Sequence, residues 1–154
     1  MKINVLQIES SELSKCIHQA ALDPHLDNQS LDLICESTNY FNFSGLCTSL
    51  THLPYLRKKL NSSSKTKLIA LIGFPFGTNP NNFKIKEAEW AESQGADELE
   101  IVPNFYALHQ GKENTFAEEI ARICEIGLPV RAILDSNKLT HQKLSLAIEA
   151  SIEA

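Results

Sequence analysis

The sequence predicts an α/β fold in which about five β-α units build a parallel sheet. Segments with strand character alternate with helical segments along the 154 residues, and the strands recur at roughly regular intervals. Residues 67–72 (KLIALI) form a continuous apolar run, which is typical of a parallel strand covered on both faces. Within 95–111 (GADELEIVPNFYALHQG), carboxylates alternate with branched apolar residues, so that Glu98 and Glu100 share one face of a predicted strand.

Two units are predicted before the apolar strand. Residues 10–16 suit a short helix, whereas 17–22 (IHQAAL) fit either a first strand or a continuation of that helix, because periodicity does not decide over so few residues. From Asp27, a polar cap leads into apolar residues at helical spacing. Residues 43–49 (FSGLCTS) are predicted as the second strand, and 51–60 as a helix with leucines along one stripe.

The apolar strand ends in a glycine-punctuated loop, residues 73–79 (GFPFGTN), and a helix is predicted over 83–94. That helix closes at Gly95, which tolerates the left-handed conformation that helix ends adopt. Lys84 and Lys86 flank an apolar position of this helix, and we predict both to be surface groups.

Two further elements follow the acidic strand. Thr115 and Glu118 match a capping box, which predicts the start of a helix at that point. Residues 129–134 are the fifth predicted strand, with Arg131 on one face, and Thr140 is predicted to cap a last helix. Because side chains alternate between the two faces along each strand, we expect Arg131 and Glu100 to project from the same face of the sheet.

Composition excludes several classes of function. The formal net charge of −5 and the pI near 5.5 argue against binding of a nucleic-acid backbone. No stretch approaches the roughly 18 apolar residues that span a bilayer, and the first residues lack a signal-peptide pattern, so we expect a cytoplasmic protein. The 4 cysteines and 5 histidines show no zinc-type spacing, which predicts reduced thiols and no metal site.

Two architectures accommodate five such units. A flavodoxin-like, doubly wound sheet is complete at this size and would suit a non-catalytic binding module. An eight-unit barrel normally takes about 200 residues or more, so this chain would hold only its first five units. Composition does not separate the two.

Motifs in the second half carry a resemblance. IGFPFGTN, then GADELEIV with FAEE behind it, then VRAILDS, resemble the deoxyribose-phosphate aldolase family in order and separation, and LCTS and IHQAALDP resemble its second and first strands. The resemblance covers the chain from about Cys16 onward. It implies that residues 1–154 are one partial (β/α)8 domain of a class I aldolase, an enzyme that needs no metal or other cofactor. That reaction makes 2-deoxyribose 5-phosphate reversibly from acetaldehyde and glyceraldehyde 3-phosphate.

The resemblance also assigns roles. Glu100 matches the family's acidic, proton-transferring residue on strand four, where the family has Asp, and it is our candidate catalytic residue. Arg131 matches a lysine of strand five, Cys47 matches a cysteine that lines the barrel, and His18 stands where the family usually has Asp. These three are expected to line the substrate pocket. Ala20, where the family usually has Thr, is a further departure.

The family's Schiff-base lysine lies on strand six, which this sequence does not reach. We therefore expect the chain to be inactive alone, and we expect the open sheet edges to permit a homo-oligomer. The expected substrate is a small phosphorylated sugar or aldehyde.

Structural roles remain open for each candidate. Glu100 and Arg131 fit a structural ion pair as well as a catalytic one. Glu98 fits a solvated or structural carboxylate, His18 a satisfied side chain at the barrel mouth, and Cys47 a small packing residue.

Overall fold

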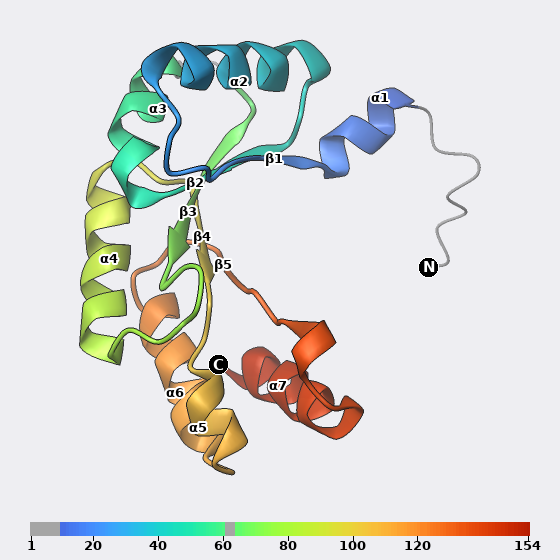
Figure 1. The fold of residues 1–154 in the computed structure, drawn as a ribbon, viewed down its shortest axis with the longest axis vertical. Helices are drawn as coiled ribbons and strands as arrows, with labels where there is room; N and C mark the ends of the chain where they lie inside the picture. The colour runs from blue at the N-terminus through green and yellow to red at the C-terminus, as the bar shows by residue number, and fades with distance from the viewer. Residues whose placement is uncertain (1–9, 61–63) are drawn as a thin grey trace.

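A computed structural model describes residues 10–60 and 64–154 (Figure 1). The first nine residues, which bear on the expected absence of a signal peptide, lie outside the described residues, as do 61–63. The strands are β1 (His18–Ala21), β2 (Gly45–Thr48), β3 (Lys67–Ile72), β4 (Glu98–Ile101) and β5 (Val130–Ala132). The helices are α1 (Ser10–Leu13), α2 (Asn28–Phe41), α3 (Leu53–Lys59), α4 (Asn81–Ser93), α5 (Phe105–His109), α6 (Glu113–Cys124) and α7 (His141–Glu153), with 3₁₀ turns η2 (Ser14–Cys16), η3 (Leu50–His52) and η4 (Ser136–Lys138).

The order of the strands decides between the two architectures. All neighbours are parallel, and the sheet runs β1-β2-β3-β4-β5 in the order of the sequence. A flavodoxin-like sheet reverses direction after its first unit and has the order 2-1-3-4-5. The doubly wound alternative is therefore wrong, and the five units form a sector of a barrel-type sheet with β1 and β5 at its open edges.

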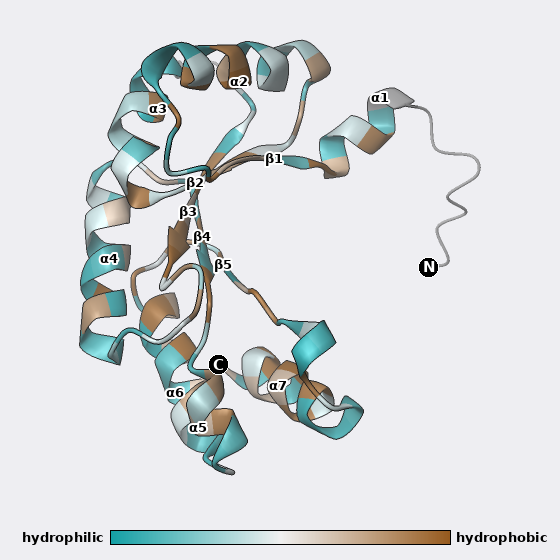
Figure 2. Ribbon diagram, viewed as in Figure 1, coloured by the Kyte–Doolittle hydropathy of each residue, from teal (hydrophilic) through white to brown (hydrophobic). Residues whose placement is uncertain are grey.

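The helices also follow the barrel arrangement. α2, α3, α4 and α6 contact the strands from one side (Figure 1). Alternate strand residues, among them Leu46, Leu68, Ile72 and Leu99, pack against these helices in the main hydrophobic core. In Figure 2, β3 has the colour of hydrophobic residues, whereas α3 and α4 beside it mix hydrophilic and hydrophobic residues. The opposite face holds a small apolar cluster of Cys47, Ile69 and Leu71. The main hydrophobic core thus lies between the helices and one face of the sheet, whereas the opposite face carries only the small apolar cluster and polar side chains.

Several helix ends follow their predicted chemistry. Asp27 caps α2, its carboxylate accepting the Ser30 N–H at 2.8 Å. Hydrogen bonding with the Ser30 side chain, and then with the Ser30 backbone, holds the pKa of the Asp27 carboxyl below its usual value. Thr140 caps α7 through Lys143 N–H at 3.3 Å. Gly95 has the expected positive φ, +86°.

Two local predictions were wrong. The capping box at Thr115 does not start a helix, because α6 already begins at Glu113 with Lys112 at the N-cap. Lys84 is not a surface group, since it is 0 % exposed, whereas Lys86 is exposed as expected. The segment 17–22, which was ambiguous, is strand because its backbone pairs with β2.

Candidate active site on the open face

The four candidate residues meet on the open face of the sheet. In the register, Glu100 is the partner of Arg131, and Cys47 is the partner of Ala20, two residues beyond His18. Since side chains alternate along a strand, these positions all project to the face opposite the main core. Four different strands therefore contribute one side chain each to a single polar cluster.

Glu100 is the centre of this cluster. Its Oε2 accepts a hydrogen bond from the Cys47 thiol at 3.1 Å. Its Oε1 lies 3.4 Å from Arg131 Nε and 3.6 Å from His18 Nδ1. The Glu100 side chain is only 17 % exposed, so the guanidinium compensates a carboxylate that is largely removed from water.

Arg131 connects Glu100 and His18 with a second carboxylate, Glu98. Its Nη1 lies 3.4 Å from His18 Nε2, and its Nη2 forms an ion pair with Glu98. Glu98 also pairs with Lys67, which stands at the start of β3. Glu98 is buried, so the solvated interpretation was wrong and the structural one is supported by its two cationic partners.

Lys67 was missed as a member of the cluster. In the sequence it is the polar end of an apolar run, and nothing nearby indicates a partner. Its contact to Glu98 depends on the pairing of β3 with β4, which brings together residues 31 positions apart. Of the described lysines, Lys67 is the one whose amine forms an ion pair within this cluster, and its partner is the Glu98 carboxylate.

Cys47 is held as a protonated thiol. Burial, and then the hydrogen bond to Glu100, raise the pKa of this thiol well above its ordinary value, outweighing the opposite effect of Arg131. A thiol with a raised pKa is a poor nucleophile, because the thiolate is the reactive form. The packing interpretation of Cys47 is consistent with this environment.

We expect iodoacetamide at pH 8 to alkylate Cys16, which is exposed, and to leave Cys47 unmodified in the folded chain. Peptide mapping by mass spectrometry measures both sites, and the urea-unfolded chain is the control in which both react. Alkylation of Cys47 at a rate equal to that of Cys16 under native conditions would contradict its assignment as a buried thiol.

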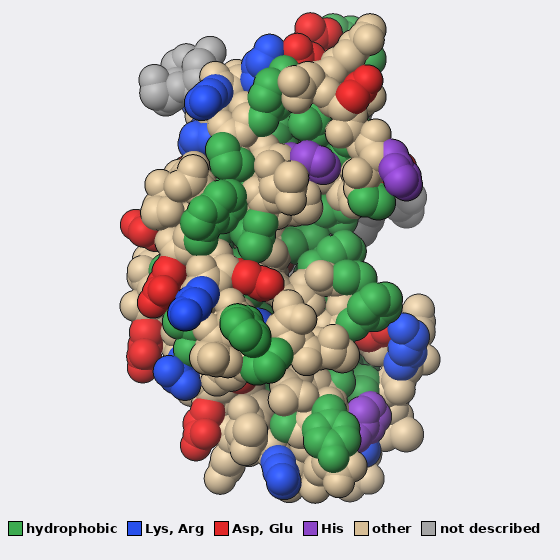
Figure 3. All heavy atoms as spheres, turned by 60° about the vertical axis from the view of Figure 1, so that its left-hand side comes forward, with side chains coloured by type: hydrophobic (Ala, Val, Ile, Leu, Met, Phe, Trp, Pro, Cys, Tyr) green, Lys and Arg blue, Asp and Glu red, His purple; other side chains and the backbone are tan. Residues whose placement is uncertain are grey.

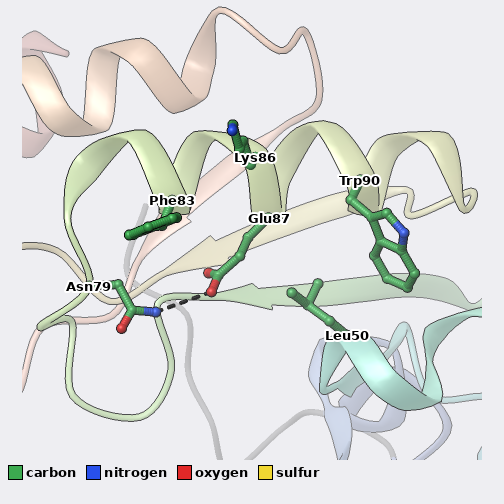
Figure 4. Close-up of a pocket in the computed structure, with 6 residues that line it drawn as sticks. All are labelled: Leu50, Asn79, Phe83, Lys86, Glu87 and Trp90. Carbon is green, nitrogen blue, oxygen red and sulfur yellow. Dashed lines mark hydrogen bonds between the residues drawn. The ribbon is translucent and has the colours of Figure 1, made fainter.

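A separate hollow of about 480 Å³ lies on the helical side of the molecule (Figure 4). It is lined by Leu50, Asn79, Phe83, Lys86, Glu87 and Trp90. Glu87 accepts hydrogen bonds from Gly73 N–H at 2.7 Å and from Asn79 Nδ2 at 3.1 Å, and so fixes the loop that follows β3. This hollow contains none of the four candidate residues, and it is distinct from the polar cluster.

The match to known proteins spans almost the whole chain. A deoxyribose-phosphate aldolase from Trichormus variabilis is 32 % identical over 144 residues, which cover 93 % of this chain and 63 % of the relative. Another from Crocosphaera subtropica is 30 % identical over 93 % of this chain and 65 % of the relative. The chain is a homologue of the deoxyribose-phosphate aldolases. It spans 63 % of the Trichormus variabilis relative and 65 % of the Crocosphaera subtropica relative, less than two thirds of each.

Solved structures agree with the aldolase fold. A protein described as QR15, an aldolase, is 28 % identical and superposes with a TM-score of 0.86 over 92 % of this chain and 64 % of that one. A deoxyribose phosphate aldolase from Aeropyrum pernix, described as a tetramer, has the same fold with a TM-score of 0.79 at 22 % identity, covering 94 % of this chain and 61 % of that one. No protein-family model matches the chain.

Within the described ranges, no three His, Cys, Asp or Glu side chains gather into a group that could hold a metal ion. The helices of those same ranges include none that is both long and apolar enough to cross a membrane.

Proposed function

We propose that this chain is the five-unit part of a deoxyribose-phosphate aldolase-type barrel and that residues 1–154 form one partial domain. Its reaction is the reversible cleavage of 2-deoxyribose 5-phosphate to glyceraldehyde 3-phosphate and acetaldehyde. The observation that carries the proposal is the convergence of Glu100, Cys47, His18 and Arg131 on the open face of a sheet whose order is that of a barrel.

In this proposal Glu100 is the proton-transfer group. Class I aldol chemistry needs an acid/base residue that moves protons around the carbinolamine and the enamine. Glu100 lies on the open face, where it accepts a hydrogen bond from the Cys47 thiol and lies within ion-pair distance of His18 and Arg131. It is one methylene longer than the Asp that the family has at this position, so its carboxylate extends further from the strand.

Arg131 has a supporting role. A guanidinium stays protonated near neutral pH, so it cannot exchange protons as the family's lysine at this position could. It instead compensates the charges of Glu98 and Glu100 at once. His18 and Cys47 then line the pocket and orient the Glu100 carboxylate.

The reactive amine comes, in this proposal, from strand six of the completed barrel, as the resemblance implies. Of the described lysines, Lys84 is buried against Glu119 and Lys67 is paired with Glu98. A lysine that attacks a carbonyl needs an amine that is free to reach the substrate, and both of these amines are engaged by carboxylates. Neither residue suits that step.

The test supplies the missing units as a second polypeptide, taken from the Trichormus variabilis relative. We expect no cleavage of 2-deoxyribose 5-phosphate by the 154-residue chain alone and measurable cleavage by the mixture. Borohydride trapping should label a lysine of the added polypeptide. Turnover by the chain alone, with a lysine of this chain labelled, would overturn the assignment.

In the active mixture, Glu100→Gln should lower kcat by about 100-fold or more, because the amide cannot exchange the proton. Glu100→Asp, which restores the residue of the family, should retain activity, and the exposed Glu118→Gln is the matched control. Equal rates for Glu100→Gln and the parent chain would exclude Glu100 as the proton-transfer group.

A further inference from the structure

Three charged side chains of α4 and α6 bind the loops at the carboxyl ends of β3 and β4. They are Lys84 and Glu87 of α4 and Glu119 of α6. Lys84 and Glu119 are 0 % and 2 % exposed. Other acidic and basic side chains lie on the outer surface of this side of the molecule, where water solvates them (Figure 3). The chemistry assigned to the open face uses none of the three.

Lys84 and Glu119 hold the β4 segment, which we define as residues 102–104. Lys84 Nζ donates to the Val102 carbonyl at 3.0 Å, and Glu119 Oε2 accepts the Asn104 N–H at 2.7 Å. The two side chains also pair with each other at 3.0 Å. The first residue of this segment is only two positions beyond Glu100. The buried pair therefore fixes the direction in which the backbone leaves β4, directly after the candidate proton-transfer group.

The same face of α4 holds the β3 loop, residues 73–79. Glu87, one helical turn after Lys84, accepts hydrogen bonds from the Gly73 N–H at 2.7 Å and from Asn79 Nδ2 at 3.1 Å (Figure 4). The aliphatic part of Lys84 passes beside this loop, since a Cβ on Gly73 would lie 2.8 Å from Lys84 Cε. A Cβ on Gly77 would meet a carbonyl oxygen of the β4 segment at 2.3 Å. The two loops and α4 thus form one contiguous set of contacts.

Packing alone does not require a charged pair at this position. Replacing a buried ion pair by well-packed apolar side chains of similar volume is often neutral or stabilising. Apolar side chains, however, could not bind the Val102 carbonyl or the Asn104 N–H. What Lys84 and Glu119 add is therefore control over the backbone of the β4 segment.

We propose that Lys84, Glu87 and Glu119 are positioning residues for the reaction on the open face. They fix the two loops and, through the backbone of β4, the position of the Glu100 carboxylate. This inference rests on the proposed function, in which Glu100 transfers the proton. The hydrogen bonds of the three residues run to the loops and to each other, so they act through the backbone. A misplacement of about 1 Å is enough to slow such a step substantially.

NMR spectroscopy of the 154-residue chain alone tests the positioning without any need for activity. Lys84→Met/Glu119→Leu replaces the pair by apolar side chains. We expect the Asn104 N–H to exchange with solvent about tenfold faster or more, because it loses its carboxylate acceptor. We also expect the carbon-13 signal of the Glu100 carboxyl group to shift. An unchanged Glu100 signal in a folded variant with faster exchange would overturn the positioning role, and unchanged exchange would show that the pair does not hold the segment.

Glu87→Ala provides the same test at a half-buried position, and it decides the question if the double variant does not fold. It should accelerate exchange of the Gly73 N–H and shift the Glu100 signal. Glu89→Ala is the matched control, since it removes the same side chain from an exposed position of the same helix and should change neither. Equal spectra for Glu87→Ala and Glu89→Ala at Gly73 and Glu100 would contradict the proposal.

The active mixture provides a kinetic measurement. Rates are expressed per lysine trapped by borohydride, so that loss of folded protein is not counted. Lys84→Met/Glu119→Leu should then lower kcat about tenfold and leave KM within about twofold, whereas Glu89→Ala should alter neither. An unchanged kcat per trapped site would show a purely structural role. Absence of turnover with the parent chain would instead count against the proposed function, and the NMR measurements would still decide whether the three residues position Glu100.

Discussion

Lys84→Met is expected to destabilise the folded chain by about 3–5 kcal/mol, because it removes one partner of a buried ion pair. Lys84 is fully buried, and its Nζ donates to Glu119 Oε2 and to the Val102 carbonyl, both at 3.0 Å. Glu119 also accepts the Asn104 N–H at 2.7 Å. The pair thus connects α4, α6 and the segment that leaves β4. Removing Lys84 leaves the Glu119 carboxylate buried without a cationic partner.

Urea unfolding monitored by circular dichroism measures this change. Lys86→Met is the matched control, since it removes the same charge from the same helix at an exposed position and should alter the free energy of unfolding by less than about 0.5 kcal/mol. The double variant Lys84→Met/Glu119→Gln, which leaves no unpaired charge, should recover part of the loss. Equal stability of Lys84→Met and Lys86→Met would show that the buried pair is not formed.

Gly77→Ala should cost more than about 2 kcal/mol, because it combines backbone strain with a steric clash. Gly77 has a φ of +67°, and a Cβ at this position would lie 2.3 Å from the Pro103 carbonyl oxygen and 2.9 Å from that of Val102. Both atoms belong to the backbone that follows β4. The loops after β3 and β4 would therefore have to separate at the carboxyl ends of the strands.

Gly111→Ala separates the two contributions. Gly111 has nearly the same φ, +68°, but a Cβ at this position would have no described atom within 4 Å beyond its immediate chain neighbours. This variant should lose only the strain, roughly 1–2 kcal/mol. A comparable loss in both variants, measured by urea unfolding, would mean that the close approach of the two loops contributes nothing.

The strands were predicted reliably from local sequence patterns. The alternation around Glu98 to Ile101 placed the carboxylates and the apolar side chains on opposite faces, and β4 has that arrangement. The apolar run 67–72 is β3 with the same bounds. These patterns can be recognised in the sequence because successive side chains of a strand point to opposite faces. When one face is buried, every second residue is therefore apolar.

Errors arose where a side chain's environment depends on a distant element. Lys84 was predicted at the surface because charged residues are almost never fully buried unless they are paired. Its partner is 35 residues away on another helix. Lys67 was missed for the same reason, since its pairing with Glu98 exists only through the β3–β4 register.

By itself, the sequence determined the α/β class, the positions of the five units and the residue types available for proton transfer. These depend on local periodicity and on chemistry that each residue carries with it. The motif resemblance already favoured a barrel sector over a doubly wound sheet, and the tertiary structure decided the matter by giving the order of the strands. It also decided which charges meet, because strand pairing and helix packing bring together groups that no local pattern relates.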